Sequence, residues 1–322
     1  MRIILVGSVG TVKRLRVSLG TLVAIEATAD TTANTAGHGL AFAEATDVIA
    51  VNATATGCKS ARAASDSIGT VAHAAVERAF AAIEHINRLM HPLAEGSDLA
   101  RINTASLHEP TRVHPSVGQL LNLARRINAL TDGVFDPCTP AQPGLLSDIE
   151  VSEDETQVVC HAPVALDFGG FAKGYAVDCA IEALVASGCT AGLVNAGGDL
   201  RVFGQRSEPV FVRGVAGELI NIELTNAALA VSDATAHQRP PEHQGYYVRT
   251  GDDETAGAQQ AGRPLAVSYA AVVASTGAVA DALAKCVLLC PPPMAARVLR
   301  AFGATQAPLS ADLADASTHN SI

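Results

Sequence analysis

The chain has 322 residues, of which 48% are hydrophobic and 17% charged, which is enough for one large or two modest folded domains. Its formal net charge of −10 disfavours a nucleic-acid or anionic-membrane surface, since both need basic patches. The seven cysteines form no CxxC pair and no zinc spacing with His, which favours free thiols in a reducing compartment. No stretch reaches the length of a membrane span and the start is too short for a signal-peptide core, so we expect a cytoplasmic protein.

The first part of the chain combines strand-like runs with one strong helical pattern. Residues 3–6 are typical of a strand and turn, because the glycines after them lack the GxGxxG spacing of a dinucleotide site. Residues 15–26 predict a strand that contains a turn at Leu19 and Gly20. Residues 28–69 form a poorly defined insertion with weak periodicity, in which one strand is expected at 47–51. Apolar residues at three- and four-residue steps then predict an amphipathic helix over 72–90.

The rest of the chain alternates between helices and short strands. The expected helices cover residues 115–130, 172–187, 277–290 and 291–302. The expected strands cover residues 158–160, 164–167, 192–203, 210–215, 219–224 and 265–274. These elements follow no regular strand–helix repeat, which favours an α+β fold over a doubly wound one.

The strongest chemical signal is the segment LDFGGFAKGYAVD at residues 166–178. An apolar strand ends at Asp167, Gly169 and Gly170 let the backbone turn closely, and a helix starts near Ala172. A helix N-terminus offers free amides and positive partial charge to a phosphate, and Lys173 adds a full positive charge. A plain strand–glycine–helix connection, with Asp167 as a cap and Lys173 in solvent, explains these residues equally well.

A second glycine pair, Gly197–Gly198, follows this helix inside the strand expected at 192–203. Adjacent glycines in a strand weaken it and often mark a bulge or the close approach of a ligand. Two glycine pairs that bracket one helix therefore favour a shared ligand pocket over two unrelated irregularities.

Two carboxylates outside these segments also need an explanation. Asp136 is held extended by Pro137 after a turn at Asp132, which indicates either a plain turn or a functional loop. Asp281 lies in an otherwise apolar helix, where a buried carboxylate without a partner is costly. It is expected either to face water or to pair with Lys285, one turn later.

Together and in this order, these segments resemble the FAD:protein FMN transferase (ApbE) family, whose members move FMN from FAD onto a Thr or Ser hydroxyl of an acceptor protein with a divalent metal. The resemblance runs from about Arg16 to Leu289 apart from the insertion, and it is most specific in DFGGFAKGYAVD and LVNAGGDLRVFG. Supporting matches lie at residues 19–21, 97–103, 131–137 and 280–284. The resemblance implies a single domain over 1–322, with the insertion at 28–69 and a frayed tail after 307. It also implies an α+β, T-fold-related architecture of mixed or antiparallel sheets packed by helices.

The resemblance implies an FAD site and a Mg²⁺ site, and the glycine pairs and Lys173 described above support the FAD site. The cofactor-binding positions are Leu19, Val134, Phe135, Asp136, Asp167, Gly169, Gly170, Lys173, Gly197, Gly198 and Val248. The backbone carbonyl of Ala172 and the carboxylate of Asp281 match the family's metal ligands, and Asp281 is also the expected catalytic residue. Such oxygen ligands suit magnesium, which bridges phosphates.

The chain departs from the family pattern at several of these positions. The Thr expected as a third metal ligand is Lys285, whose ammonium cannot ligate a cation but can occupy its position as a point charge. The family's His motif is matched only by residues 247–251, without a His, its StSG turn by residues 232–235, and an aromatic residue over the flavin by Leu93.

These departures leave several functions open. The alternatives are an active Mg²⁺-dependent flavin transferase, an FAD-binding paralogue without transferase activity, and a hydrolase that splits FAD into FMN and AMP. A generic α+β protein without flavin is the remaining alternative.

Overall fold

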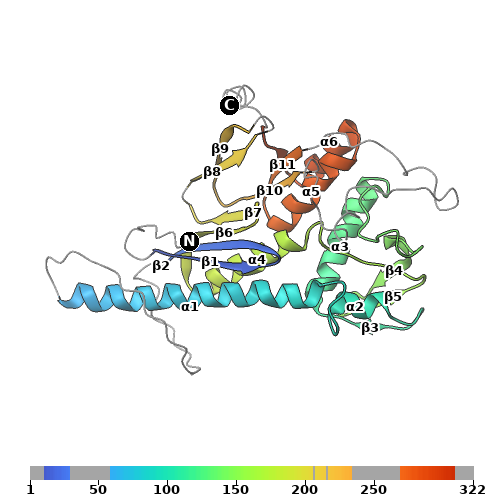
Figure 1. The fold of residues 1–322 in the computed structure, drawn as a ribbon, viewed down its shortest axis with the longest axis horizontal. Helices are drawn as coiled ribbons and strands as arrows, with labels where there is room; N and C mark the ends of the chain where they lie inside the picture. Colours follow the sequence, from blue (N-terminus) through green and yellow to red (C-terminus); the bar gives the residue numbers. More distant parts are fainter. Residues whose placement is uncertain (1–10, 30–58, 206, 215–216, 234–268, 309–322) are drawn as a thin grey trace.

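A computed structural model describes residues 11–29, 59–205, 207–214, 217–233 and 269–308. Its centre is a seven-stranded sheet with the strand order β1-β2-β6-β7-β10-β11-β12, in which every paired strand runs antiparallel to its neighbour (Figure 1). The strands are β1 (Thr11–Ser18), β2 (Thr21–Ala29), β6 (Cys189–Ala196), β7 (Asp199–Phe203), β10 (Ala228–Asp233), β11 (Tyr269–Ala274) and β12 (Thr305–Gln306).

Helices cover one face of this sheet and extend beyond it. They are α1 (Lys59–Met90), α2 (Asp98–Asn103), α3 (Pro115–Leu130), α4 (Ala172–Ala186), α5 (Gly277–Leu289) and α6 (Pro292–Ala301). Helix α1 packs on β1, β2 and α4, α4 packs on β6 and β7, and α5 packs on β10 and β11. Antiparallel sheets packed by helices confirm the α+β prediction.

Two smaller sheets complete the described structure. Strands β3 (Thr111–Arg112), β5 (Gln157–Cys160) and β4 (Ile149–Val151) form a three-stranded sheet beside α3, which Figure 1 places away from the large sheet. Strands β8 (Glu208–Arg213) and β9 (Leu219–Leu224) form a hairpin whose apolar side chains pack with those of β7, β10 and β11.

The period-two alternation of β7 sends its side chains to opposite faces of the sheet. Leu200 and Val202 pack in the cluster with the β8–β9 hairpin, whereas Asp199 and Arg201 form ion pairs with residues of α4. This strand therefore delivers one carboxylate and one guanidinium to the face that the helices cover.

The structure corrects three predicted elements. Helix α1 begins at Lys59 and β2 extends to Ala29, so both ends of the expected insertion belong to regular elements, and its residues 30–58 are outside the described residues. An Ala-rich segment favours a helix even where its small side chains give little periodicity. Residues 164–167 are not a strand but make an isolated bridge between Leu166 and Cys138. Residues 192–203 are not one strand, because the glycine pair separates β6 from β7.

Other predicted elements are found close to their expected bounds, including α3, α4, α5, α6 and the β8–β9 hairpin. The strands expected at 3–6 and 47–51 lie outside the described residues, as does the chain after residue 308. Within the described ranges, no helix is both long and apolar enough to cross a bilayer.

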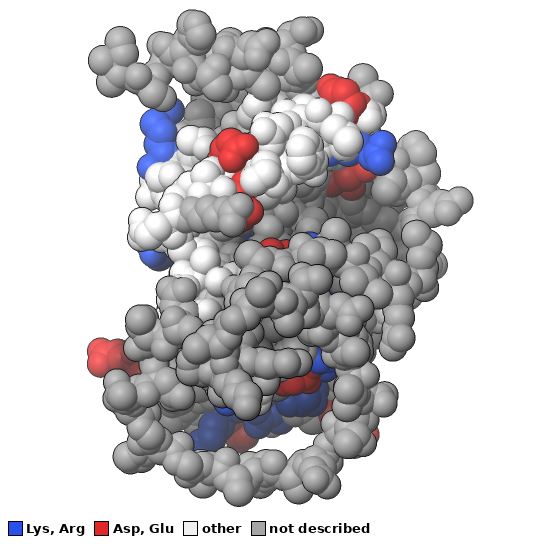
Figure 2. Space-filling model, turned by 90° about the vertical axis from the view of Figure 1, so that its left-hand side faces the viewer, with Lys and Arg blue, Asp and Glu red and all other residues white. Residues whose placement is uncertain are grey.

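The charged side chains that are visible on the face drawn in Figure 2 carry both signs. The cations of β1 have acidic neighbours, since Lys13 lies 3.2 Å from Glu26 and Arg16 lies 2.5 Å from Glu77. Each cation of this strand therefore lies beside a carboxylate, with Arg14 and Arg16 sharing Glu77.

Candidate functional site

The segment that leads into α4 is held by hydrogen bonds from its backbone amides. The Asp167 amide donates to the carbonyl of Pro137 (3.0 Å), and the Gly169 amide donates to Oδ1 of Asp167 (2.8 Å). A Cβ added at Gly170 would meet no atom within 4 Å. Gly169 is exposed, and among the described residues none lies within 4 Å of a Cβ placed on Gly170, so neither glycine blocks the approach to the first turn of α4.

Asn103 connects residues 97–103 to the segment before α4. Its side-chain amide donates to the Leu166 carbonyl (3.0 Å), and its Oδ1 accepts from the Leu166 amide (2.7 Å). Helix α2, which ends at Asn103, is capped by Ser97, whose hydroxyl accepts from the Ala100 amide (3.0 Å). The motif therefore holds the residue directly before Asp167 in place.

Most of the first amides of α4 have partners inside the protein, which changes the expected phosphate site. The Phe171 and Ala172 amides donate to the carbonyl of Phe168 at 2.9 and 2.7 Å. The Gly174 amide donates to Oδ2 of Asp281 (3.1 Å). The available positive charge here is therefore the ammonium of Lys173, whose side chain is 34% exposed and forms an ion pair with Asp199.

Two tight hairpin turns lie side by side at the sheet edge. Leu19 and Gly20 (φ 53° and 70°) connect β1 to β2, and Gly197 and Gly198 (φ 67° and 102°) connect β6 to β7. A two-residue turn with positive φ at both positions matches the twist of antiparallel strands. A Cβ on Gly197 would collide with Thr21, because β2 pairs with β6. The glycine pair therefore forms a turn that packs against the first hairpin.

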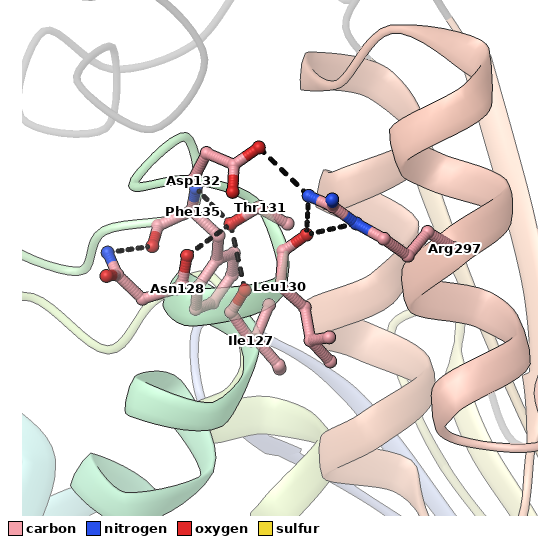
Figure 3. A network of polar contacts seen from close by, with 7 residues as sticks. All are labelled: Ile127, Asn128, Leu130, Thr131, Asp132, Phe135 and Arg297. Carbon is pink, nitrogen blue, oxygen red and sulfur yellow. Dashed lines mark hydrogen bonds and ion pairs between the residues drawn. The ribbon is translucent and has the colours of Figure 1, made fainter.

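The loop after α3 is built around a capped helix end, drawn in Figure 3. The Thr131 hydroxyl donates to the Ile127 carbonyl (2.9 Å) and accepts from the Phe135 amide (3.1 Å). The side-chain amide of Asn128 donates to the Phe135 carbonyl (2.8 Å). Arg297 of α6 donates to the Leu130 carbonyl and pairs with Asp132 (2.9 Å), as Figure 3 shows.

The predicted cofactor residues of this loop have partners within the protein. The Phe135 side chain is 5% exposed and packs edge-on against Phe171, with ring centroids 5.6 Å apart. The Asp136 carboxylate accepts from the amides of Cys138 (2.8 Å) and Leu146 (3.2 Å). Val134 is half-buried against the main core. The loop therefore supports the segment at 166–171, and its side chains point largely into the protein.

Helices α4 and α5 cross at a pair of glycines. A Cβ on Gly174 would collide with the backbone of Gly277, and one on Gly277 would collide with the backbone of Gly174. The carboxylate of Asp178 accepts from the Gly277 amide (2.7 Å) and the Ala278 amide (2.9 Å), and it pairs with Arg201 (2.7 Å). This close crossing places Asp281 of α5 against the first turn of α4.

Two further ion pairs lie at this crossing, one buried and one partly exposed. Lys285 pairs with Oδ1 of Asp281, so the predicted pairing one turn apart is confirmed, and Lys173 pairs with Oδ2 of Asp199. Burial raises the pKa of Asp199, and the Asp281 carboxylate raises it further, while the ammonium groups of Lys173 and Lys285 oppose this rise. Among the described residues, no donor lies within hydrogen-bonding distance of Asp199 Oδ1.

The residues at Asp281 do not fit a divalent cation. Oδ1 of Asp281 is against the Lys285 ammonium, and Oδ2 accepts from the Gly174 amide. Magnesium needs several oxygen ligands, and an ammonium offers none. Over the ranges that the structure covers, no three His, Cys, Asp or Glu side chains lie together as a metal-binding group. The expected ligand pair of Ala172 and Asp281 is thus not available as it stands.

The structure gathers most of the predicted site residues at one edge of the large sheet. The two hairpin turns pack against each other, the start of α4 pairs with the strand after the second turn, and Asp281 accepts from the first turn of α4. The loop after α3 is hydrogen-bonded to the segment before α4. Val248 lies outside the described residues, as do residues 247–251 and the end of the turn at 232–235. Leu93, the expected flavin-covering position, is 81% exposed.

Asp199 and Asp178 are site residues that the sequence reasoning did not assign. Asp199 begins the buried strand β7 directly after a glycine turn. Because a buried carboxylate is costly without a partner, its position in the sequence could have predicted a cation beside it. Asp178 is a carboxylate in the mostly apolar helix α4. The same pattern, a carboxylate in an apolar helix, drew attention to Asp281.

The model of the ApbE family matches residues 60–145 and 139–308 of the chain. No curated protein matches its sequence. The flavinyl transferase ApbE from Pseudomonas stutzeri, in its apo form, superposes with a TM-score of 0.65 at 16% identity, covering 92% of this chain and 90% of that one. The flavin transferase ApbE from Vibrio cholerae gives 0.61 at 17% identity with 94% of both chains covered. The ApbE protein from Thermotoga maritima gives 0.59 at 20% identity, with 90% and 87% covered. At these identities the likeness shows a shared fold.

Proposed function

The chain belongs to the ApbE family, and from that premise we propose that it binds FAD and transfers the FMN moiety to a Thr or Ser hydroxyl of an acceptor protein. The observation that carries the proposal is the meeting of three elements at one sheet edge: the turns at Leu19–Gly20 and Gly197–Gly198, and the start of α4 with Lys173. Similar structures from Pseudomonas stutzeri and Vibrio cholerae are flavin transferases, which supports the same reaction class.

In the proposed binding mode, the FAD pyrophosphate is held by exposed backbone and by the positive charge of Lys173, and buried polar side chains contribute less. Gly169 and Gly170 leave room for a pyrophosphate to approach the backbone closely. Lys173 offers its ammonium from the first turn of α4, where the helix dipole also favours negative charge. Phe168 and Phe171, which flank this glycine pair, are buried and pack with each other, and Phe171 also packs with Phe135.

The proposed reaction is a phosphoryl-type displacement. The acceptor hydroxyl oxygen forms a bond to the phosphorus of the FMN half, the bond from that phosphorus to the AMP oxygen breaks, and AMP leaves. The hydroxyl proton is released to solvent or to a base. Catalysis of such a step rests mainly on positioning and on positive charge around the phosphates. Lys173 supplies that charge in our proposal.

Magnesium dependence, which the resemblance implies, is not part of the proposed reaction. Asp281 would be the residue that holds the ion together with the Ala172 carbonyl, but Asp281 is already paired with Lys285. The catalytic role expected for Asp281 is replaced in our proposal by a positioning role, in which its carboxylate holds the first turn of α4 through the Gly174 amide. The cytoplasmic location expected from the sequence stays a prediction.

A second candidate function is FAD binding without transfer. The Lys285–Asp281 pair favours it, because losing a metal would remove charge stabilisation from the reaction while leaving the FAD-binding backbone intact.

One experiment separates the two candidates. The purified protein is mixed with FAD and a library of Thr- and Ser-containing peptides, and flavin fluorescence, AMP release and peptide mass are measured. Peptides that gain the mass of FMN, with one AMP released for each, would support transfer. Bound FAD with neither product would support the binding function alone, and free FMN with AMP but no peptide product would indicate hydrolysis. Failure to bind FAD at all would contradict both candidates.

A further inference from the structure

Four charged side chains from α4, β7 and α5 form a quartet, which we define as Lys173, Asp199, Asp281 and Lys285, and all of them except Lys173 are buried. Lys173 pairs with Asp199, and Lys285 pairs with Asp281. The two pairs interact with each other, because both Asp281 and Lys285 affect the pKa of Asp199. Two ammonium groups and two carboxylates give the quartet no formal net charge. Charges buried in such a place are tolerated only when they are paired.

Within the quartet, the Lys285 ammonium is the cation that pairs with the buried Asp281 carboxylate. Asp281 is fully buried and the Lys285 side chain is 6% exposed, so an unpaired carboxylate at Asp281 would be strongly destabilising. The ammonium satisfies that carboxylate from within its own helix, four residues later. A divalent ion at the same place would meet the ammonium and be repelled by it.

The two lysines of the quartet differ in their exposure. Lys285 is enclosed, whereas the Lys173 side chain is 34% exposed at the start of α4. Asp199 connects the two, and its Oδ1 has no donor among the residues that the structure describes. The enclosed Lys285 therefore balances the Asp281 carboxylate inside the protein, whereas Lys173, which pairs with Asp199, is partly exposed at a place that an anionic ligand can approach.

We propose that Lys285 permanently replaces a divalent cation at Asp281, so that this protein binds FAD without any metal. The inference rests on the proposed FAD binding and deepens it by naming the source of positive charge. A built-in ammonium stays in the fold at every metal concentration. FAD binding should then be insensitive to chelators, and the protein without flavin should not respond to magnesium.

The wild-type protein provides the first test and needs no substitution. Flavin-free protein is treated with EDTA, and its thermal unfolding is followed with and without MgCl₂. FAD affinity is then measured by flavin fluorescence under the same two conditions. We expect the same melting temperature in both, and FAD dissociation constants within about twofold of each other.

The variant Lys285→Thr provides the second test. It removes the ammonium and leaves the Asp281 carboxylate unpaired beside the Asp199 carboxylate, so the melting temperature should fall without metal. Magnesium should raise it again, because the cation now has oxygen ligands in place of an ammonium. FAD affinity should become dependent on magnesium by about tenfold or more.

Lys13→Thr is the matched control. It makes the same substitution at a partly exposed lysine that pairs with Glu26 (3.2 Å) on the β1–β2 hairpin, outside the quartet. This variant should show no response to magnesium in either measurement.

Three results would overturn the inference. They are a loss of wild-type FAD affinity by tenfold or more in EDTA, a rise of the wild-type melting temperature with magnesium, or a folded Lys285→Thr variant that gains no magnesium response. If Lys285→Thr does not fold, the wild-type measurements alone decide. Absence of FAD binding by the wild type under both conditions would contradict the proposed function, while the melting experiments would still test the role of Lys285.

Discussion

At the scale of single residues, Asp178 connects three elements through one carboxylate. Its oxygens accept hydrogen bonds from the first two amides of α5 and pair with Arg201 of β7. Burial raises its pKa, while the backbone amides of Ala278 and Gly277 and the Arg201 guanidinium favour the charged form. The residue therefore acts as a helix cap supplied from a different helix.

Asp178→Asn should lower the free energy of unfolding by about 3 kcal/mol, because it leaves the Arg201 guanidinium without its charged partner in a mostly buried place. Urea denaturation measures the change. The control is Asp132→Asn, which removes the exposed ion pair with Arg297 and should cost less than about 1 kcal/mol. Equal losses in the two variants would contradict a special role for Asp178.

Cys179 is a half-buried thiol in α4 that we expect to react slowly. Burial, and to a smaller extent the charges of Glu182 and Asp178, raise its pKa from 9.0 to about 12. Because the thiolate is the reacting form, alkylation by iodoacetamide at about pH 8 should be slower than for an ordinary thiol by about a thousandfold. Mass spectrometry of the peptide that contains Cys179 measures the rate, and reactivity should return in urea. Rapid labelling of this residue in the folded protein would show that the thiol is not buried in this way.

Of the two ion pairs in the quartet, the sequence predicts the Asp281–Lys285 pair but not the Lys173–Asp199 pair. Asp281 and Lys285 are four residues apart in an apolar helix, so their pairing follows from helix geometry alone. Lys173 and Asp199 are 26 residues apart, and their contact depends on the register of the β6–β7 hairpin and on the packing of α4. Local periodicity carries no information on such a contact, which is why Asp199 was not assigned.

At the scale of elements, the crossing of α4 and α5 determines where the quartet lies. Gly174 and Gly277 allow the two backbones to touch, and larger residues would separate the helices. The separation would move Asp281 away from the Gly174 amide and the start of α4.

Gly174→Ala should destabilise the protein by about 2 kcal/mol, because the clash with the Gly277 backbone outweighs the better helix propensity of Ala. The matched variant is Gly170→Ala, where a Cβ meets no atom within 4 Å, and its melting temperature should stay unchanged. Thermal unfolding compares the two. A stable Gly174→Ala variant would mean that the helices can move apart freely.

Element prediction succeeded where a local signal marks both ends of the element. Helix α3 begins at Pro115, directly after its N-cap His114, and α4 is followed by Gly188 with a φ of 85°, so sequence and structure agree closely at these positions. The glycine pair at 197–198 was misread, because adjacent glycines fit both a bulge in one strand and a turn between two. Only the antiparallel pairing of Ala196 with Asp199 decides between them.

At the scale of the whole molecule, the site is assembled from segments that lie far apart in sequence. The hairpin turns at 19–20 and 197–198, the start of α4 and the first half of α5 come from three separate stretches of the chain. The sequence predicts each of these stretches separately, and the family resemblance relates them to one site. Their proximity in space depends on the strand order of the sheet, which the sequence does not predict. A ligand that bridges them should stabilise all of them at once.

Hydrogen exchange with and without FAD tests this assembly. We expect FAD to slow amide exchange in the two hairpin turns and in residues 169–174, because the ligand would hold these segments together and reduce their local opening. The internal controls are the three-stranded sheet of β3, β5 and β4 and the β8–β9 hairpin, whose exchange should stay unchanged because they lie in other sheets. Protection that is confined to either control sheet would place the flavin elsewhere and contradict the proposed site, whereas protection of both turns together with the start of α4 would support it.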